Sequence, residues 1–139
     1  MGYGLEVDLI RKAHALDFLT TPYVFNEDES KAMTKAGADL IVAHMGLTTK
    51  GSIGAKTALT LAQAATRVQA IADAAHRVRK DVLVICHGGP IAEPEDAQYI
   101  LRKTAGVAGF YGASSMERLP VERALTEQVR RFKGLKFGE

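Results

Sequence analysis

The stretch that decides the fold is Gly37-Ala-Asp-Leu-Ile-Val-Ala-His-Met-Gly-Leu-Thr-Thr-Lys-Gly-Ser-Ile-Gly-Ala-Lys56. Its apolar run from Leu40 to Ala43 ends at His44, and a loop rich in glycine and hydroxyl residues follows. A long helical pattern begins at about Leu59. This order predicts a buried strand that delivers a polar loop to one rim of a sheet, with the next helix covering a face of that sheet.

The composition is that of one globular domain spanning residues 1–139. Apolar residues make up 47% of the chain and charged residues 24%, so a hydrophobic core can form. The formal net charge of +2 is too small to predict binding to nucleic acid or to a membrane surface. No apolar run approaches the roughly 20 residues of a membrane span, and the single cysteine, Cys86, favours a reducing, cytoplasmic location.

Helical patterns separate the segments that read as strands. Asn26 and Glu29 have the spacing of a helix cap, and Gly37 suits the end of that helix. Pro120 opens a last helix, which is expected to carry its apolar residues inward. Strands are expected at residues 20–25, 40–43, 82–86 and 107–111, and a first helix at residues 5–16. The residues of the last helix expected to face inward are Val121, Leu125, Val129 and Phe132.

Helices between successive strands predict an α/β fold with a parallel sheet and right-handed crossovers. Two architectures fit this order. One is a (βα)4 half of a TIM barrel, and the other is a flavodoxin-like open sheet with helices on both faces. In both, the carboxyl ends of the strands form one rim, and the candidate site lies there.

Two histidines end adjacent predicted strands. The rings of His44 and His87 are expected within several ångströms of each other, where either could transfer a proton or bind a metal through a neutral nitrogen. The alternative is that both are structural, hydrogen-bonded histidines. Glu117 is the one acid expected on the same rim; it could act in catalysis or instead pair with Arg118.

Glycine-rich turns follow the last two predicted strands. Their backbone amides could approach a phosphate or carboxylate, or the glycines could simply make tight turns before helices. Because side chains alternate between the two faces of a strand, Cys86 lies on the face opposite His87, and its thiol is expected to be buried and inert. Tyr23 and Tyr111 are expected to pack at the rim. The candidate anion-binding residues are Gly88, Gly89, Gly112, Ala113, Ser114 and Ser115.

Long motifs carry a resemblance to a known family. They are His44-Met-Gly-Leu-Thr-Thr with Gly51-Ser-Ile-Gly-Ala-Lys-Thr, then Cys86-His-Gly-Gly-Pro-Ile-Ala, then Gly109-Phe-Tyr-Gly-Ala-Ser-Ser-Met-Glu-Arg-Leu-Pro. Over essentially its whole length the chain closely resembles the phosphoenolpyruvate hydrolase-like family of TIM-barrel signal-transduction proteins. The resemblance implies a (βα)8 barrel, a small phosphorylated or carboxylated substrate, and hydrolase or lyase chemistry of the phosphoenolpyruvate/pyruvate superfamily.

The chain is little more than half the length of such a barrel, which takes about 250 residues. The resemblance aligns residues 1–139 with strands five to eight, so Met1 is expected to be internal to a longer protein. Mg²⁺ is the cofactor that the superfamily implies, but its ligands come largely from earlier strands, and no metal ligand is assigned here. Activity is expected to need a partner, either a second copy in a homo-oligomer or an N-terminal half-barrel. The alternative function is non-catalytic, as a ligand-binding, signalling or assembly module.

Overall fold

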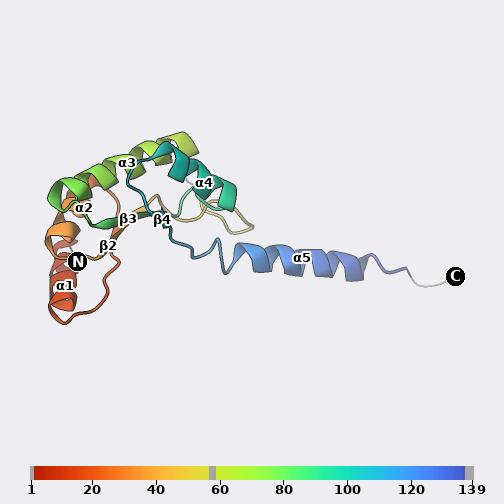
Figure 1. Ribbon diagram of the computed structural model, residues 1–139. Helices are drawn as coiled ribbons and strands as arrows, with labels where there is room; N and C mark the ends of the chain where they lie inside the picture. Colours follow the sequence, from red (N-terminus) through yellow and green to blue (C-terminus); the bar gives the residue numbers. More distant parts are fainter. Residues whose placement is uncertain (1, 57–58, 137–139) are drawn as a thin grey trace.

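A computed structural model describes residues 2–56 and 59–136 of the chain (Figure 1). Four parallel strands form one sheet in the order β1-β2-β3-β4, which is also their order along the chain. A flavodoxin-like sheet reverses its strand order at a switch point, so that alternative is wrong, and the half-barrel prediction is confirmed. The elements are α1 (Gly4–Ala15), β1 (Tyr23–Val24), α2 (Glu27–Lys35), β2 (Leu40–His44), α3 (Leu61–Val78), β3 (Leu83–His87), α4 (Pro94–Lys103), β4 (Gly109–Phe110) and α5 (Leu119–Lys133).

The register of the sheet brings the two histidines side by side. Leu40 pairs with Leu83, and four residues further along each strand His44 pairs with His87. The outer strands β1 and β4 have two residues each and are shorter than the sequence predicted. Backbone pairing still extends beyond β1, because the carbonyl of Pro22 accepts a hydrogen bond from Val42.

Local capping fixes where the helices begin. The Asn26 side chain accepts a hydrogen bond from the Glu29 amide at 2.9 Å, and Gly37 has a φ of +99°, so both predicted ends of α2 are confirmed. Thr60 and Gln63 form a reciprocal capping box at the start of α3. These caps hold the helix starts at the same end of the sheet as the carboxyl ends of the strands.

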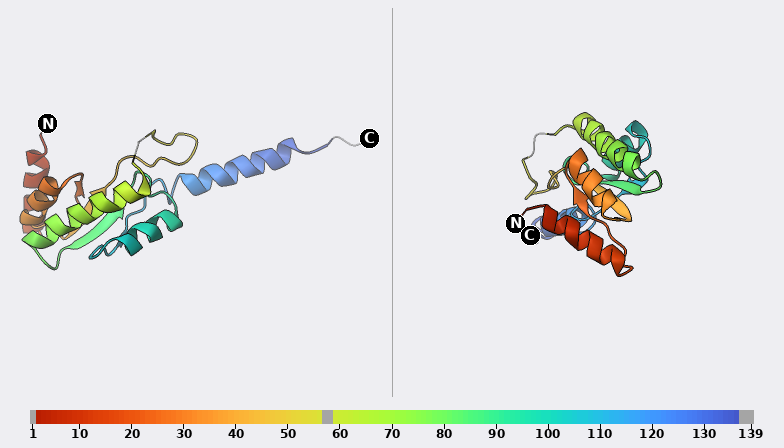
Figure 2. Two further views of the ribbon diagram at one scale, coloured as in Figure 1. Left: turned by 90° about the horizontal axis from the view of Figure 1, so that it is seen from above. Right: turned by 90° about the vertical axis from the view of Figure 1, so that its left-hand side faces the viewer.

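The helices α2, α3 and α4 lie along one face of the sheet (Figure 2). The buried core forms between them and the strand residues that point toward them, among which are Ile41, Val84 and Cys86. The residues that alternate with these point to the opposite face, where Leu83 is 52% exposed. One face of the sheet is therefore buried under helices, and the other is partly open. No helix in the described part of the chain is long and apolar enough to cross a membrane.

Helix α5 projects away from the rest of the molecule (Figure 1). The sequence predicted that its apolar residues face inward, and this is wrong for the chain by itself. In a complete barrel each helix of the outer ring packs on the strands that precede and follow it, but β4 is the last strand of this sheet, so α5 has little to pack against. Its apolar residues are exposed: Val121 54%, Leu125 62%, Val129 54% and Phe132 64%.

Candidate functional site

The two histidines lie in contact at the carboxyl end of the sheet. The ring centroids of His44 and His87 are 4.8 Å apart, with the ring planes at 74°, so their expected proximity is confirmed. Tyr23 stacks on His87 at 5.1 Å and an angle of 22°. Phe25 lies 4.9 Å from His44, and Tyr111 lies 5.8 Å from His87. Five aromatic or imidazole rings from four strand ends therefore form one cluster on the open face.

Hydrogen bonds to the backbone fix the tautomer of each imidazole. Nδ1 of His44 accepts a hydrogen bond from the Gly46 amide at 2.9 Å, so in the neutral ring the proton is on Nε2. Nδ1 of His87 lies 2.7 Å from the carbonyl oxygen of Tyr111, which can only accept, so this nitrogen carries the proton. The neutral pair therefore offers a donor at Nε2 of His44 and a free lone pair at Nε2 of His87.

Burial and the neighbouring imidazole both act on His44. Burial disfavours the charged ring and lowers the pKa of His44 below its usual value of 6.5, and the nearby His87 lowers this pKa further. The two rings therefore resist carrying a positive charge together. At neutral pH we expect His44 to act as a neutral hydrogen-bond donor.

The titration of His44 should report this coupling. We expect the His44 ring to titrate below pH 6.5, and the His87→Ala substitution to raise its midpoint, because both the neighbouring charge and part of the burial are removed. A lowered pKa in the folded chain means that the unfolded chain binds this proton more readily. The contribution of neutral His44 to the free energy of unfolding is therefore fully present above about pH 6.5 and decreases as the pH falls. Histidine ring signals in NMR spectra measure the midpoint. A midpoint that is unchanged in His87→Ala, or equally changed in His76→Ala, would contradict this assignment.

The donor set of the cluster does not suit a metal ion. A histidine that binds a metal usually donates its second ring N–H to an acceptor. His87 does so to the Tyr111 carbonyl, but His44 instead accepts from Gly46 at that position, so only one of the two rings is arranged as a ligand. Mg²⁺ prefers carboxylate and other oxygen ligands. Across residues 2–56 and 59–136, no group of three or more His, Cys, Asp and Glu side chains is placed to hold a metal.

The loop after β4 presents unpaired backbone amides. The carbonyl oxygens of Ala113 and Ser114 accept hydrogen bonds from residues 116–119 at the entrance to α5. The amides of residues 112–115 donate no hydrogen bond to another described residue. Such a turn can bind an anion through its N–H groups, which is what the sequence predicted for Gly112 to Ser115.

The turn after β3 packs tightly against the loop after β2. Gly88 and Gly89 have φ values of +72° and +59°, and the Gly89 amide donates to the Gly46 carbonyl at 2.6 Å. A Cβ atom on Gly89 would collide with the carbonyl oxygen of Met45. The Gly89 amide is therefore engaged within the protein, and the loop after β4 has more unpaired amides for an anion.

Replacement of Gly89 by alanine should destabilise the chain. The change combines a left-handed backbone conformation with a collision against a main-chain atom, and we expect a loss of about 1–3 kcal/mol in the free energy of unfolding. Gly109→Ala is the matched control, since its Cβ would meet its nearest neighbour at 3.7 Å, an ordinary contact. Urea denaturation of the two variants makes the comparison. Equal losses would contradict the steric assignment.

Residues 46–56 form a strap that crosses from β2 toward α4 and α5. Thr49 donates its amide to the Gly89 carbonyl at 3.1 Å. Nζ of Lys50 lies 2.7 Å from Oδ2 of Asp96, and the Lys50 carbonyl accepts from Arg118 at 2.9 Å. The strap thus connects the ends of β2 and β3 with the loop that precedes α5.

Asp96 is a buried acid that sequence reasoning missed. Burial alone would raise its pKa, but hydrogen bonds from Lys50 and from the amides of Ala92 and Glu93 outweigh burial and lower the pKa of Asp96. The signal in the sequence was the acidic first turn of α4, but acids after a proline are typical of any helix start and do not by themselves indicate a buried ion pair. Its link to Lys50, 46 residues earlier, could not be read from local pattern.

The remaining predicted residues lie around this site. Glu117 is exposed, and its amide donates to the Ala113 carbonyl; its side chain makes no hydrogen bond to another described residue, and its catalytic role stays a prediction. Cys86 lies on the helix-covered face, where burial raises the pKa of its thiol to about 11. His14 is exposed, whereas His76 is partly buried and bonds to the Val82 carbonyl.

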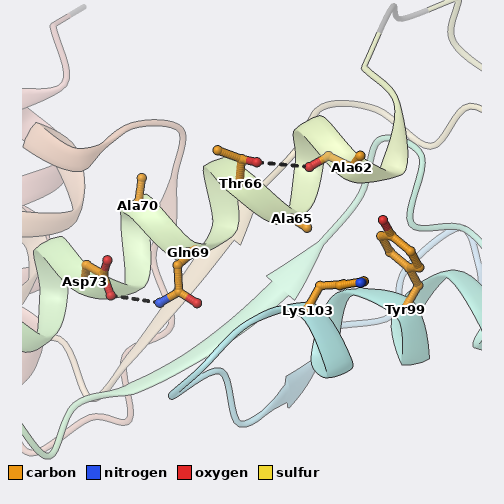
Figure 3. Close-up of a pocket in the computed structure, with 8 residues that line it drawn as sticks. All are labelled: Ala62, Ala65, Thr66, Gln69, Ala70, Asp73, Tyr99 and Lys103. Atoms are coloured by element: carbon orange, nitrogen blue, oxygen red, sulfur yellow. Dashed lines mark hydrogen bonds between the residues drawn. The ribbon is translucent and has the colours of Figure 1, made fainter.

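A hollow lies on the helical side of the sheet, between α3 and α4 (Figure 3). Its volume is about 500 Å³. Two of its polar side chains have partners: Gln69 donates to Asp73 at 2.8 Å, and Thr66 donates to the Ala62 carbonyl at 3.2 Å. The hollow is separated from the histidine pair by the sheet, and it carries no part of the candidate chemistry.

The fold is a (βα)4 unit of the TIM-barrel class. Its parallel strands follow one another in consecutive order, helices cover one face, and polar residues lie at the carboxyl ends of the strands. A putative phosphonomutase from Burkholderia cenocepacia J2315 superposes with a TM-score of 0.57 at 16% identity, covering 79% of this chain and 51% of that one. The N-acetylmannosamine-6-phosphate 2-epimerase from Clostridium perfringens gives a TM-score of 0.51 at 19% identity, covering 91% and 48%. At these identities the likeness shows the fold alone.

The chain belongs to the phosphoenolpyruvate hydrolase-like family, whose model matches residues 1–135. Two tomato (Solanum lycopersicum) proteins, ToMV susceptible protein tm-1(GCR26) and ToMV resistance protein Tm-1(GCR237), are each 64% identical over 135 residues. The putative transcriptional regulatory protein y4pA of Sinorhizobium fredii (strain NBRC 101917 / NGR234) is 29% identical over 135 residues. The matches cover 97% of this chain, but only 18% of each tomato protein and 22% of the bacterial one.

Proposed function

We propose that this chain forms half of the active site of a phosphoenolpyruvate hydrolase-like enzyme, corresponding to strands five to eight of the barrel. Its substrate is a small phosphorylated or carboxylated molecule, and full activity needs the other half-barrel. The observation that carries this proposal is the histidine pair, whose ring centroids lie 4.8 Å apart. The pair offers one donor and one free lone pair on the rim that also holds the loop of unpaired amides. The protein is proposed to act in the cytoplasm, where Cys86 stays a free thiol.

The roles of the two rings follow from their tautomers. The amides of residues 112–115 hold the anionic group, and Nε2 of His87 accepts a proton from an attacking water. Water forms a new bond to phosphorus as the bond from phosphorus to the enol oxygen breaks. Nε2–H of His44 donates a hydrogen bond to the oxygen that becomes negatively charged, which stabilises the departing enolate. The proton held by His87 then returns to the product.

Ligand binding and turnover test this proposal. We expect inorganic phosphate to shift the NMR signals of residues 112–115, and phosphoenolpyruvate to shift these signals and both histidine rings. Release of phosphate and pyruvate should be measured with and without added Mg²⁺, for this chain and for it together with a complementary half-barrel. Absence of both the shifts and the turnover would refute the enzymatic proposal.

A second candidate is a non-catalytic half-barrel that binds ligand weakly or serves in signalling or assembly. The partly open sheet face and the exposed apolar side of α5 favour association with another half-barrel, either a second copy or an N-terminal half. Light scattering at several concentrations tests this. A monomer that unfolds cooperatively at every concentration would exclude self-association.

A further inference from the structure

A cleft opens beside His44. It lies between the end of β1, the end of β2 and the first turns of α3, and its volume is about 520 Å³. Phe25, Met45 and Leu59 supply apolar parts of its wall. The polar side chains that line it are those of His44, Gln63 and Arg67.

All three polar side chains face the cleft with hydrogen-bond donors to offer. Nε2 of His44 carries a proton in the neutral ring, because Nδ1 accepts from Gly46. Oε1 of Gln63 accepts from Thr60 in the capping box, which leaves the Gln63 amide nitrogen as its other hydrogen-bonding group. A guanidinium has five N–H donors, and Arg67 uses one of its nitrogens on the Phe25 carbonyl at 3.0 Å.

Arg67 is the charged residue that lines the cleft, and within the described ranges Arg67 forms no ion pair and no acidic side chain lines the cleft. The nearby acids lie outside it: Glu27 lines an adjoining hollow, and Glu29 accepts a hydrogen bond from the Phe25 amide. Arginine can bind a carboxylate with two parallel hydrogen bonds, and such charge-assisted bonds are stronger than neutral ones. A set of donors without an acid therefore suits an anionic group, and the apolar walls suit the carbon skeleton attached to it.

We propose that this cleft is a second acid-group subsite, which binds the carboxylate of a substrate whose phosphate lies on the loop of residues 112–115. The subsite rests on the proposed function, because His44 lines the cleft and also belongs to the histidine pair of the proposed reacting centre. A substrate with two acid groups would then be held by Arg67 and Gln63 at one end and by backbone amides at the other. His44 would contact the ligand from the floor of the cleft.

Two simple probes separate the two subsites. NMR titration of the 139-residue chain with pyruvate should shift the side-chain signals of Gln63 and Arg67 and the ring of His44. Methyl pyruvate, which lacks the negative charge, should produce no such shifts. Inorganic phosphate should shift the amides of residues 112–115 instead.

Two variants test the cleft with different structural consequences. Arg67→Gln should weaken pyruvate binding about tenfold or more, as expected for the loss of a charged hydrogen bond. Arg77→Gln is the control, because it makes the same charge change elsewhere on α3, and it should leave pyruvate binding within about twofold of the wild type. Gln63→Glu preserves the capping box and adds a favourable charge at a helix N-terminus. This variant should therefore keep its melting temperature while pyruvate binding falls several-fold through repulsion.

Each contrary result has a distinct meaning. If pyruvate shifts residues 112–115 and leaves the cleft unchanged, or if Gln63→Glu binds pyruvate as well as the wild type does, the carboxylate subsite is refuted and the proposed function stands. If neither phosphate nor pyruvate shifts the loop, the cleft or either histidine ring, and no turnover is found with a complementary half-barrel, the proposed function fails together with the subsite.

Discussion

Replacement of His87 by alanine is expected to slow the release of phosphate and pyruvate from phosphoenolpyruvate by about 10²- to 10⁴-fold, the usual contribution of a general acid or base. The substitution removes the lone pair at Nε2, which the hydrogen bond from Nδ1 to the Tyr111 carbonyl holds in place. It also removes the ring on which Tyr23 stacks. The rate should be measured in the form of the protein that shows turnover.

His76→Ala is the matched control for this prediction. His76 is also partly buried and also bonds to a backbone carbonyl, that of Val82, but it lies on α3 away from the rim. We expect this variant to keep its activity. The free energy of unfolding should be measured for both variants. Loss of activity in proportion to loss of folded protein, or equal loss in the two variants, would contradict a catalytic role for His87.

Replacement of Ile71 by alanine is expected to lower the free energy of unfolding by about 2–5 kcal/mol, because it leaves a cavity in the core. Ile71 is 1% exposed and lies on the face of α3 that packs on the sheet and on α2. Its backbone carbonyl accepts a buried hydrogen bond from Ser30 at 2.9 Å, and this bond does not depend on the side chain. The loss should therefore reflect packing alone.

Ile53→Ala deletes the same atoms at a position that is 76% exposed, and we expect a change within about 0.5 kcal/mol. Urea denaturation of both variants measures the difference. His87→Ala should cost activity more than stability, and Ile71→Ala the reverse. Equal melting-temperature losses in His87→Ala and Ile71→Ala would contradict the division between site and core.

The sequence determined the order of strands and helices because these depend on local chemistry. Apolar runs of the right length predicted β2 and β3, and the cap at Asn26 and the turn at Gly37 predicted the ends of α2. Parallel strands place their carboxyl ends on one rim, so the approach of His44 to His87 followed from topology before any coordinates. The family followed from motifs that lie on this same rim.

Tertiary structure decided what depends on contacts between distant segments. The strand order excluded the open doubly wound sheet, and the missing neighbour of β4 left the apolar side of α5 exposed. The tautomers of the two rings depend on the Gly46 amide and the Tyr111 carbonyl, and Lys50 meets Asp96 across 46 residues of chain. Sequence periodicity reports which face of an element is apolar, but it does not report which group lies across from it, because that depends on how the elements pack together.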